Sequence, residues 1–431
     1  MFTLRPISLH LSAHSLRHVL VVMTMAMLPN AHHLAAAEAQ KLYEPLTTLG
    51  LQLTFTPSAT QQIGDYVVSS GLLTGLENSD GGSLVSVRSP QGSTLSLIDT
   101  PAKRGLLLTS VDGTPTFKED VPTDWLKTDY IESPEEEAIS AQAQSSDTPT
   151  AYPKIIDVLA GFSAASAKAV GDPKAYALAQ VESVNLGLRN SKISAVHLNL
   201  LGIKIIDNDY PITTEVLSKL DELFPEGRQW GADTIAAFFI GNDQNTARGW
   251  GHVGGRLTVQ TTNTSAAFRH EMGHNAGGRH CNEGQSSYKF GYNNGKSRTY
   301  LCGNDIAYYS NPYIRDKYGL PLGNINTANM ARVWAENAAR LSNYRKPEIP
   351  PLTLSGQSLG SDTIELSWNW GYITPQKTTL YRWLVPIAES TTSHYQDTGL
   401  HLGTTYRYHV IATDAKGHTA QSEYIWKATQ D

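Results

Sequence analysis

The spacing of hydrophobic residues changes along the chain and divides it into regions of different predicted structure. Between Glu38 and Val121, short apolar or alternating runs such as Ser83–Asp99 are separated by Gly, Ser, Asp and Pro. This pattern predicts short β-strands joined by turns. The stretch Ile131–Pro153 that follows is acidic and rich in Ser and Ala, without a core pattern, which is typical of a linker.

From Lys154 onward, predicted strands alternate with predicted helices. Three apolar runs predict buried strands: Lys154–Phe162, Ser194–Ile206 and Asp233–Gly241. Asp172 followed by Pro173 predicts the start of one helix, and an apolar stripe over Thr213–Phe224 predicts another. Such alternation is typical of a mostly parallel sheet. The Gly-rich run Gly249–Thr262 predicts an edge strand beside a cleft.

The last region, residues 351–431, has a third pattern of hydrophobic residues. It follows the stiff sequence KPEIPP and consists of short alternating runs separated by turn residues. These runs predict an all-β sandwich with Trp368 in its core.

Composition adds limits to this division. A chain of 431 residues predicts two to four domains, and 40% hydrophobic with 17% charged residues is an ordinary globular balance. The formal net charge of −6 gives no reason to expect a nucleic-acid partner.

The N-terminus predicts export. Arg5 and Arg17 precede the apolar run Val19–Leu28, and a stretch of small residues follows. This order predicts a secretory signal peptide over residues 1–37, because the run is too short to span a membrane. No later stretch predicts a span, so we expect a secreted, extracellular protein. We interpret residues 38–130 as a β-rich propeptide and 131–152 as a linker; the alternative is a permanent N-terminal domain.

The segment HEMGHNAGGRH, His270–His280, carries the candidate chemistry. Thr264 or Ser265 is expected to cap a helix that runs through Asn275. His270 and His274 lie one turn apart on that helix, so both imidazoles project from one face and can bind zinc. Glu271 points elsewhere and can take a proton from metal-bound water, as in the H-E-x-x-H pattern.

The third ligand is expected from the turn after the helix. Gly277 and Gly278 can end the helix at positive φ, which lets His280 return to the metal. Three histidines leave one position of a tetrahedral zinc open for water, as catalysis requires. The other histidines, His252 among them, are interpreted as ordinary core or surface residues.

This motif and its surroundings resemble metzincin metalloendopeptidases, closest to bacterial reprolysin-like members, over residues 153–346. The resemblance extends to a Y-S-N-P stretch and a closing helix packed by Met330, Val333, Trp334 and Leu341. It implies a twisted, mostly parallel sheet with helices on one side and a zinc cleft between two lobes. It also implies peptide-bond hydrolysis, with His270, His274 and His280 as ligands and Glu271 as general base.

Two positions, Leu301 and Cys281, depart from the family pattern, and Cys281 directly follows the third ligand. Leu301 stands where these enzymes have a methionine in a turn under the zinc, and we interpret it as a variant hydrophobic base. Tyr300 does not match the position of the tyrosine that acts on the metal in some relatives, so it is left out of the site. The region 351–431 resembles a fibronectin type III domain, with Tyr406 as the residue of a tyrosine corner.

Cys281 and Cys302 are the only cysteines in the chain. In an exported protein they favour a disulfide beside the metal; the alternative is Cys281 as a thiolate ligand. No cysteine precedes Cys281, so a thiol of the N-terminal region cannot cap the metal. If that region enforces latency, it blocks the cleft or supplies another ligand.

Two functions follow from these patterns. The first is a secreted zinc endopeptidase with a protein or peptide substrate held along Gly249–Gly255. The second is a non-catalytic surface or matrix-binding protein, with a structural zinc and a ligand on the C-terminal domain. The intact Glu271 and the open three-histidine site favour the enzyme. The sequence leaves calcium binding open.

Overall fold

The fold is described from a computed structural model of the chain. It covers residues 46–47, 50, 53–75, 82–133, 153–241, 247–345, 352–370, 375–383, 385–414, 419–422 and 424–430. The expected signal peptide, most of the expected linker and the Pro-rich 346–351 lie outside the described residues.

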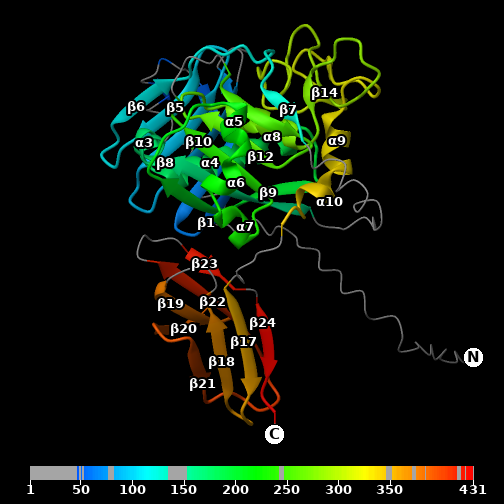
Figure 1. The fold of residues 1–431 in the computed structure, drawn as a ribbon. Helices are drawn as coiled ribbons and strands as arrows, with labels where there is room; N and C mark the ends of the chain where they lie inside the picture. Colours follow the sequence, from blue (N-terminus) through cyan, green and yellow to red (C-terminus); the bar gives the residue numbers. More distant parts are fainter. Residues whose placement is uncertain are drawn as a thin grey trace, which may run out of the picture.

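The N-terminal region forms one antiparallel sheet in which consecutive strands pair, as its alternating sequence predicts (Figure 1). Its six strands, in spatial and chain order, are β1 Leu53–Ile63, β2 Tyr66–Gly75, β3 Gly82–Arg88, β4 Thr94–Asp99, β5 Arg104–Thr109 and β6 Pro115–Glu119.

The second sheet is mostly parallel, which confirms the mixed α/β prediction for the central region. Its order is β7-β11-β12-β10-β8-β9. The strands are β7 Tyr130–Glu132, β8 Lys154–Ser163, β9 Val196–Ile206, β10 Thr234–Phe239, β11 Gly249–Val253 and β12 Leu257–Thr261. Only the β11–β12 pair is antiparallel. The first residues of the expected linker therefore belong to a strand, β7.

Helices cover both faces of this sheet. Successive side chains of a strand face opposite sides, so Ala236 and Phe238 of β10 join one core while Ile235 and Ala237 join another. The first face carries α3 Ala164–Val170, α4 Pro173–Asn190 and α8 Ala267–Asn275; the second carries α5 Thr214–Ser218, α6 Leu220–Leu223 and α7 Glu226–Trp230. The expectation of helices on one side only is therefore wrong, although those on the second face are short.

The helix predicted over Thr213–Phe224 is divided in two at Lys219. The Lys219 N–H donates to the Val216 carbonyl three residues earlier, at 3.0 Å, which tightens the turn and ends α5. Val216, Leu220 and Phe224 nevertheless reach the same core, so the apolar stripe predicted burial correctly.

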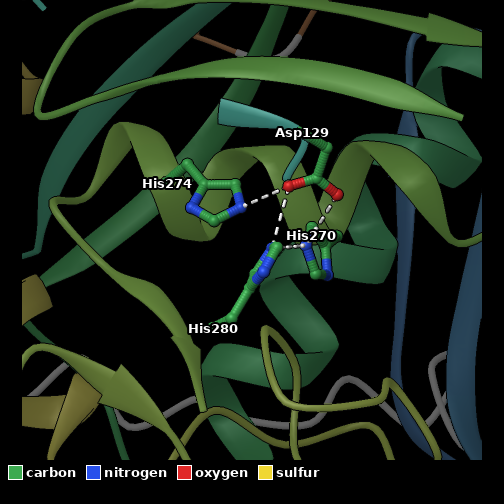
Figure 2. Close-up of side chains that lie close together, drawn as sticks. All are labelled: Asp129, His270, His274 and His280. Atoms are coloured by element: carbon green, nitrogen blue, oxygen red, sulfur yellow. Dashed lines mark hydrogen bonds and ion pairs between the residues drawn. The ribbon is translucent and has the colours of Figure 1, made fainter. Parts of the chain in front are cut away.

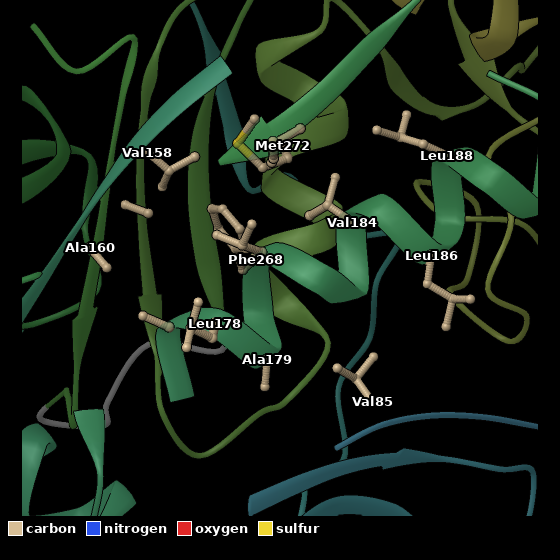
Figure 3. Close-up of a cluster of buried hydrophobic side chains, with 14 of the residues drawn as sticks. Val85, Val158, Ala160, Leu178, Ala179, Val184, Leu186, Leu188, Phe268 and Met272 are labelled. Atoms are coloured by element: carbon tan, nitrogen blue, oxygen red, sulfur yellow. The ribbon is translucent and has the colours of Figure 1, made fainter. Parts of the chain in front are cut away.

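Helix α4 is buried on all sides because it lies between the two sheets. It begins as predicted, with Asp172 accepting hydrogen bonds from two backbone N–H groups and Pro173 in the first turn. Its buried residues run without a break from Ala175 to Leu188. Figure 3 shows Leu178 and Val184 of α4, Val85 of the N-terminal sheet and Phe268 of α8 in one cluster. The N-terminal sheet thus completes the central core.

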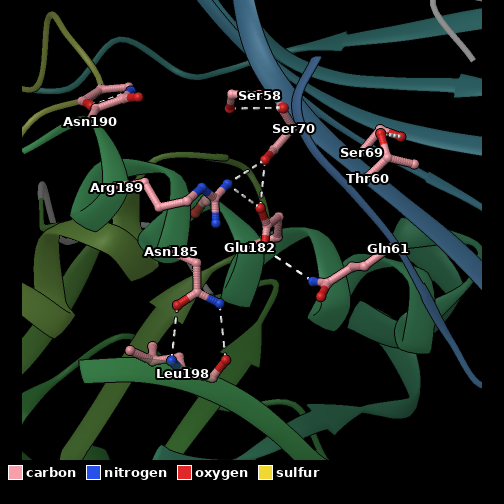
Figure 4. Close-up of polar contacts among 12 residues, drawn as sticks. Ser58, Thr60, Gln61, Ser69, Ser70, Glu182, Asn185, Arg189, Asn190 and Leu198 are labelled. Carbon is pink, nitrogen blue, oxygen red and sulfur yellow. Dashed lines mark hydrogen bonds and ion pairs between the residues drawn. The ribbon is translucent and has the colours of Figure 1, made fainter. Parts of the chain in front are cut away.

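Buried polar contacts also join the N-terminal sheet to the central region. Ser70 Oγ donates to Glu182 Oε1 at 2.5 Å, and Arg189 donates to the same oxygen at 2.5 Å (Figure 4). Asp99 accepts from Arg269 of α8 in a second, fully buried ion pair. A buried charge that loses its partner is strongly destabilising. The N-terminal sheet and the central region therefore depend on each other for stability.

The region after α8 contains short strands and a closing pair of helices. These are β13 Arg279–Cys281, β14 Phe290–Gly291, β15 Asn311–Arg315, β16 Pro321–Leu322, α9 Met330–Glu336 and α10 Ala338–Leu341. The predicted packing residues of the closing helices are buried: Met330, Val333, Trp334 and Leu341.

The C-terminal region is all-β, as predicted, and its two sheets share one core. One sheet is β17 Thr353–Ser358, β18 Ile364–Asn369 and β21 His394–Asp397. The other is β19 Pro375–Arg382, β20 Val385–Ser390, β22 Thr405–Asp414, β23 Thr419–Gln421 and β24 Ile425–Ala428. Trp368 is buried in this core, and Tyr406 Oη accepts from the His401 N–H at 3.0 Å, the hydrogen bond expected of a tyrosine corner.

Candidate metal centre

Helix α8 places two of the predicted ligands side by side. His270 and His274 are fully buried, and their ring centroids lie 5.0 Å apart. The helix ends at Asn275 as predicted, but the predicted cap is wrong. Ala266 occupies the capping position, because the Ser265 hydroxyl instead donates to Asp120 Oδ2 of the N-terminal region at 2.8 Å.

The turn after α8 brings in the third predicted ligand. Gly277 has a φ of 109°, which a side chain would strain, and β13 then carries His280 back toward the helix. His280 Nε2 lies 3.2 Å from His270 Nε2. Glycine at 277 is thus what lets one short segment supply all three imidazoles.

A fourth group, which the sequence did not reveal, is Asp129 from the residue before β7. Its Oδ1 lies 2.8 Å from His280 Nε2 and 3.2 Å from His274 Nε2, and its Oδ2 lies 3.3 Å from His270 Nε2 (Figure 2). Asp129 stands some 140 residues upstream of the motif, in a segment without a recognisable pattern. One hint of such a ligand is present in the sequence. Because no cysteine precedes Cys281, any metal ligand supplied by the N-terminal region had to be a different kind of residue.

The four residues have the chemistry and spacing of a metal site. One ligand atom from each lies within 4.8 Å of the others. Four ligands in a tetrahedron around zinc are separated by roughly 3.3 Å, close to the distances of 2.8–3.3 Å found here. His274 Nδ1 lies 2.8 Å from the Gly278 carbonyl, which fixes the tautomer that leaves Nε2 free to bind a metal. The residues present therefore fit a zinc ion, although the same donors suit other transition metals.

Burial sets the protonation preferences of these ligands. It lowers the pKa of His274 to about 4, so this imidazole is neutral at physiological pH, the form that binds metals. Burial by itself would raise the pKa of Asp129, but its interactions with the imidazoles, the charge of His270 above all, outweigh burial and hold that pKa well below its usual range. Asp129 is therefore an anion facing three nitrogen donors.

Glu271 lies beside this group without belonging to it. It is fully buried, and among the described residues neither of its carboxylate oxygens has a hydrogen-bond partner. A Cβ atom at Gly249 would lie 2.2 Å from Glu271 Oε1, and one at Gly251 would lie 3.0 Å from Oε2. Burial, and then the charge of Asp129, raise the pKa of Glu271 well above its usual range. The carboxyl thus lies under the two glycines of β11.

Leu301 packs against the backbone on both sides of His274. It is fully buried with a φ of 69°, a backbone conformation that is rare for a bulky residue. Its side chain leaves no room for a Cβ atom at Gly273 or Gly278, on either side of His274. This position agrees with a hydrophobic base under the metal. Tyr300 is also buried but lies under Arg269, and it does not join the metal group.

Cys281 and Cys302 form a disulfide, as the sequence favoured. Cys281 is therefore not a thiolate ligand. The bond ties β13, which carries His280, to the turn that contains Leu301. His252 is buried on β11 and, consistent with its interpretation as an ordinary residue, it is not in the metal group.

Comparison with known proteins does not assign the chain to a family. No family model and no curated protein matches it. Among solved structures, a chain of a chaperone–substrate complex is similar at 20% identity and a TM-score of 0.41, over 60% of this chain and 40% of that one.

Smaller matches also occur, and they too are weak. The sixth fibronectin type III domain of human fibronectin type III domain containing protein 3 is 17% identical (TM-score 0.17; 18% of this chain, 81% of that one). A pectate lyase from Erwinia chrysanthemi is 20% identical (TM-score 0.17; 18% of this chain, 28% of that one). At these scores the comparisons carry no argument about function. The metzincin and fibronectin type III resemblances therefore stay predictions, and the conclusions below depend on the site itself.

Proposed function

We propose that this protein is a zinc-dependent endopeptidase of the metzincin type, exported by the expected signal peptide. One observation carries the proposal: three imidazoles, two of them fully buried, converge on one point, with the buried carboxyl of Glu271 beside them and outside the ligand set. A site that only held a structural metal would gain nothing from a buried, unpartnered carboxyl, which is costly to keep.

His270, His274 and His280 would hold a zinc ion, which would supply Lewis-acid chemistry for the scissile carbonyl and the activation of a water. The residues of the chain provide the rest. Glu271 accepts a proton and passes it to the leaving amine, a role to which a raised pKa is suited. The backbone of β11 offers hydrogen-bonding groups along which an extended peptide can pair. The C-terminal sandwich resembles a fibronectin type III domain in its tyrosine corner. Its role is to act as a spacer or to bind a surface ligand.

A second candidate function has one observation in its favour. With Asp129 included, the site has four protein ligands, and a closed four-ligand set is typical of structural zinc. On this alternative the protein is a non-catalytic surface or matrix-binding protein. The two candidates differ in what Glu271 does.

The test measures hydrolysis of unfolded casein by the zinc-loaded full chain, before and after limited proteolysis. The Glu271→Gln variant is assayed in the same way for comparison. Glu271→Gln keeps the side chain's size and removes its basicity. We expect it to retain one zinc per chain and lose roughly 100-fold or more in rate. Glu283→Gln, which changes an exposed residue just past the third ligand, is the matched control and should cut casein normally. No hydrolysis by any form would favour the binding protein, whereas equal rates of hydrolysis for Glu271→Gln and the parent would contradict the role of Glu271 as general base.

A further inference from the structure

The larger sheet of the C-terminal region carries a group of aromatic side chains on its outer face. Tyr408 of β22 faces the core, so its neighbours Arg407 and His409 point to the other side of the sheet. Arg407 lies opposite Trp426 of β24, and the Trp383 N–H donates to the Arg407 carbonyl at 2.7 Å. We call the six side chains that meet there the outer aromatic face: Tyr381, Trp383, Arg407, His409, Tyr424 and Trp426.

These side chains pack into two rows across neighbouring strands. In the first row the two indole rings lie 5.4 Å apart, and the guanidinium carbon of Arg407 lies 5.5 Å from the ring centroid of Trp383 and 5.9 Å from that of Trp426. In the second row the ring of His409 stacks on that of Tyr381 at 4.7 Å. The contacts hold the rings in fixed positions, so the face is preformed.

Three of these rings are open to solvent. The exposed fractions are 43% for Trp383, 44% for Tyr424 and 55% for Trp426. Trp383 also has a φ of 59°, a left-handed conformation that is rare for a bulky residue. Several large aromatic rings left together in water, one of them on a strained backbone, are typical of a binding surface.

Arg407 gives the outer aromatic face a positive charge. Among the described residues it takes part in no ion pair, and its Nε has no hydrogen-bond partner there. The guanidinium instead contacts aromatic rings, most closely that of Tyr424, at 4.6 Å from its centroid. Cation–π contacts of this kind fix a guanidinium in place and leave its outer N–H groups free to donate to a ligand. The charge on this face therefore favours an anionic ligand.

The exposed area is too small for a stable protein interface and suits sugar rings. A large aromatic side chain offers ~150–250 Å², so three half-exposed rings can bury roughly 200–400 Å². A stable protein interface buries roughly 800 Å² on each partner. The C–H groups on the face of a pyranose ring carry a partial positive charge, which matches the negative face of an aromatic ring. A carboxylate on the same sugar matches the paired N–H groups of Arg407.

We propose that the outer aromatic face binds an acidic polysaccharide, with hexuronate rings packed on Trp383 and Trp426 and a carboxylate paired with Arg407. This inference rests on the part of the proposed function that gives the C-terminal sandwich a surface ligand, and it names the site and the class of that ligand. Binding there keeps the protein on a polysaccharide matrix, and the metal centre takes no part in it.

The test is affinity electrophoresis of the zinc-loaded full chain in native gels that contain alginate or hyaluronan, which are acidic, or hydroxyethyl cellulose, which is neutral. Trp426→Ala removes an exposed ring, whereas Trp426→Phe keeps a ring at that position. Arg407→Met removes the charge and keeps an unbranched side chain. Leu359→Ala changes an exposed apolar residue between β17 and β18, in the other sheet, and is the matched control.

We expect at least one of the two acidic polysaccharides to retard the parent and the neutral one to leave its mobility unchanged. Trp426→Ala and Arg407→Met should each raise the dissociation constant by roughly tenfold, because one loses ring stacking and the other loses a charge-assisted hydrogen bond. Trp426→Phe should keep most of the binding, and Leu359→Ala should bind like the parent.

Three results would overturn the proposal. Neither acidic polysaccharide could retard the parent, which would mean that the face has no such ligand. The neutral polysaccharide could retard it equally, which would contradict the role of the charge. Arg407→Met and Trp426→Ala could lower the melting temperature and leave the retardation unchanged, in which case the outer aromatic face only stabilises the sandwich.

A casein assay of the same proteins separates this proposal from the endopeptidase. Trp426→Ala lies outside the metal centre and should cut casein like the parent. Retardation by an acidic polysaccharide without casein hydrolysis by any form would refute the endopeptidase and leave the polysaccharide site. Casein hydrolysis that depends on Glu271, by a parent that neither acidic polysaccharide retards, would refute the polysaccharide site and leave the endopeptidase.

Discussion

At the scale of single residues, the proposed general base depends on two glycines, which the sequence marks only as part of a predicted edge strand. Gly249 and Gly251 cover the carboxyl of Glu271, and a methyl group at 249 would overlap it. A local pattern in the sequence predicted Glu271 as the general base. It could not show what lies above that glutamate, because β11 is about twenty residues away in the chain and meets α8 only in the fold.

Gly249→Ala is therefore expected to displace the Glu271 carboxyl without touching the metal ligands. We expect kcat/KM of the activated protein to fall by roughly 100-fold, with zinc content unchanged. The control is a double-mutant cycle: in a Glu271→Gln background the same substitution should cost almost nothing further. An equal loss in both backgrounds would show that Gly249→Ala acts on the fold and not through Glu271.

Asp120 gives a prediction about pH. Burial raises its pKa to about 6, although hydrogen bonds from Ser265 oppose this. A raised pKa means that folding takes up a proton: the stability from Asp120 is complete below about pH 4 and is lost as pH rises through about 6. Asp120→Asn removes this pH-dependent contribution to stability, and the asparagine amide can still donate a hydrogen bond to the Ser265 hydroxyl.

We expect the stability of Asp120→Asn relative to the parent to rise by roughly 2 to 3 kcal/mol between pH 4 and pH 6 and to stay level above that. Urea unfolding of both proteins across this range, with zinc removed by a chelator, measures the difference. If the stabilities of the parent and Asp120→Asn changed equally with pH, the raised pKa of Asp120 would be contradicted.

At the scale of elements, predictions from local patterns succeeded where the pattern and the fold agree. Asp172 and Pro173 begin α4 as expected, and the continuous apolar run of β10 predicted its burial on both faces. The predicted cap of α8 is wrong because the Ser265 hydroxyl donates to Asp120, the residue after β6, more than a hundred residues earlier. Local sequence describes what a side chain can do, whereas the fold decides which partner it meets.

The disulfide gives the element-scale prediction. It joins residues 21 positions apart and anchors β13, which carries His280, to the Leu301 turn. Replacing Cys281 and Cys302 together by Ser should lower the free energy of unfolding by ~3 kcal/mol. It should also weaken zinc binding, because His280 loses its anchor. Denaturant unfolding and a competitive zinc titration measure the two effects. Unchanged zinc affinity would mean that β13 is positioned without the disulfide.

At the scale of the whole molecule, the N-terminal sheet is structurally necessary to the metal domain. A helix that is buried on every side needs packing partners on every side, and the sheet β1–β6 supplies one of them for α4. The β-rich region and the metal domain were each predictable from their patterns. Their shared core was not, because it depends on contacts between segments far apart in the chain.

Deletion of residues 53–121 should therefore leave a metal domain that is insoluble or loosely packed. Expression of residues 38–133 as a separate chain should restore it, since the packing surface is then supplied again. Soluble yield and near-ultraviolet circular dichroism are the readouts, and deletion of residues 352–431 is the matched control, expected to remain folded. A monomeric, well-packed protein without β1–β6 would contradict this account.

The central claim is that one zinc held by His270, His274 and His280 works with Glu271 to cut peptide bonds. The most direct measurement is a zinc titration of the metal-stripped, activated full chain, following hydrolysis of unfolded casein. The account predicts that the rate rises in proportion to bound zinc and saturates at one ion per chain, while Glu271→Gln binds the same zinc and gains no activity. Hydrolysis that survives complete removal of the metal, or zinc binding that restores none, would contradict it.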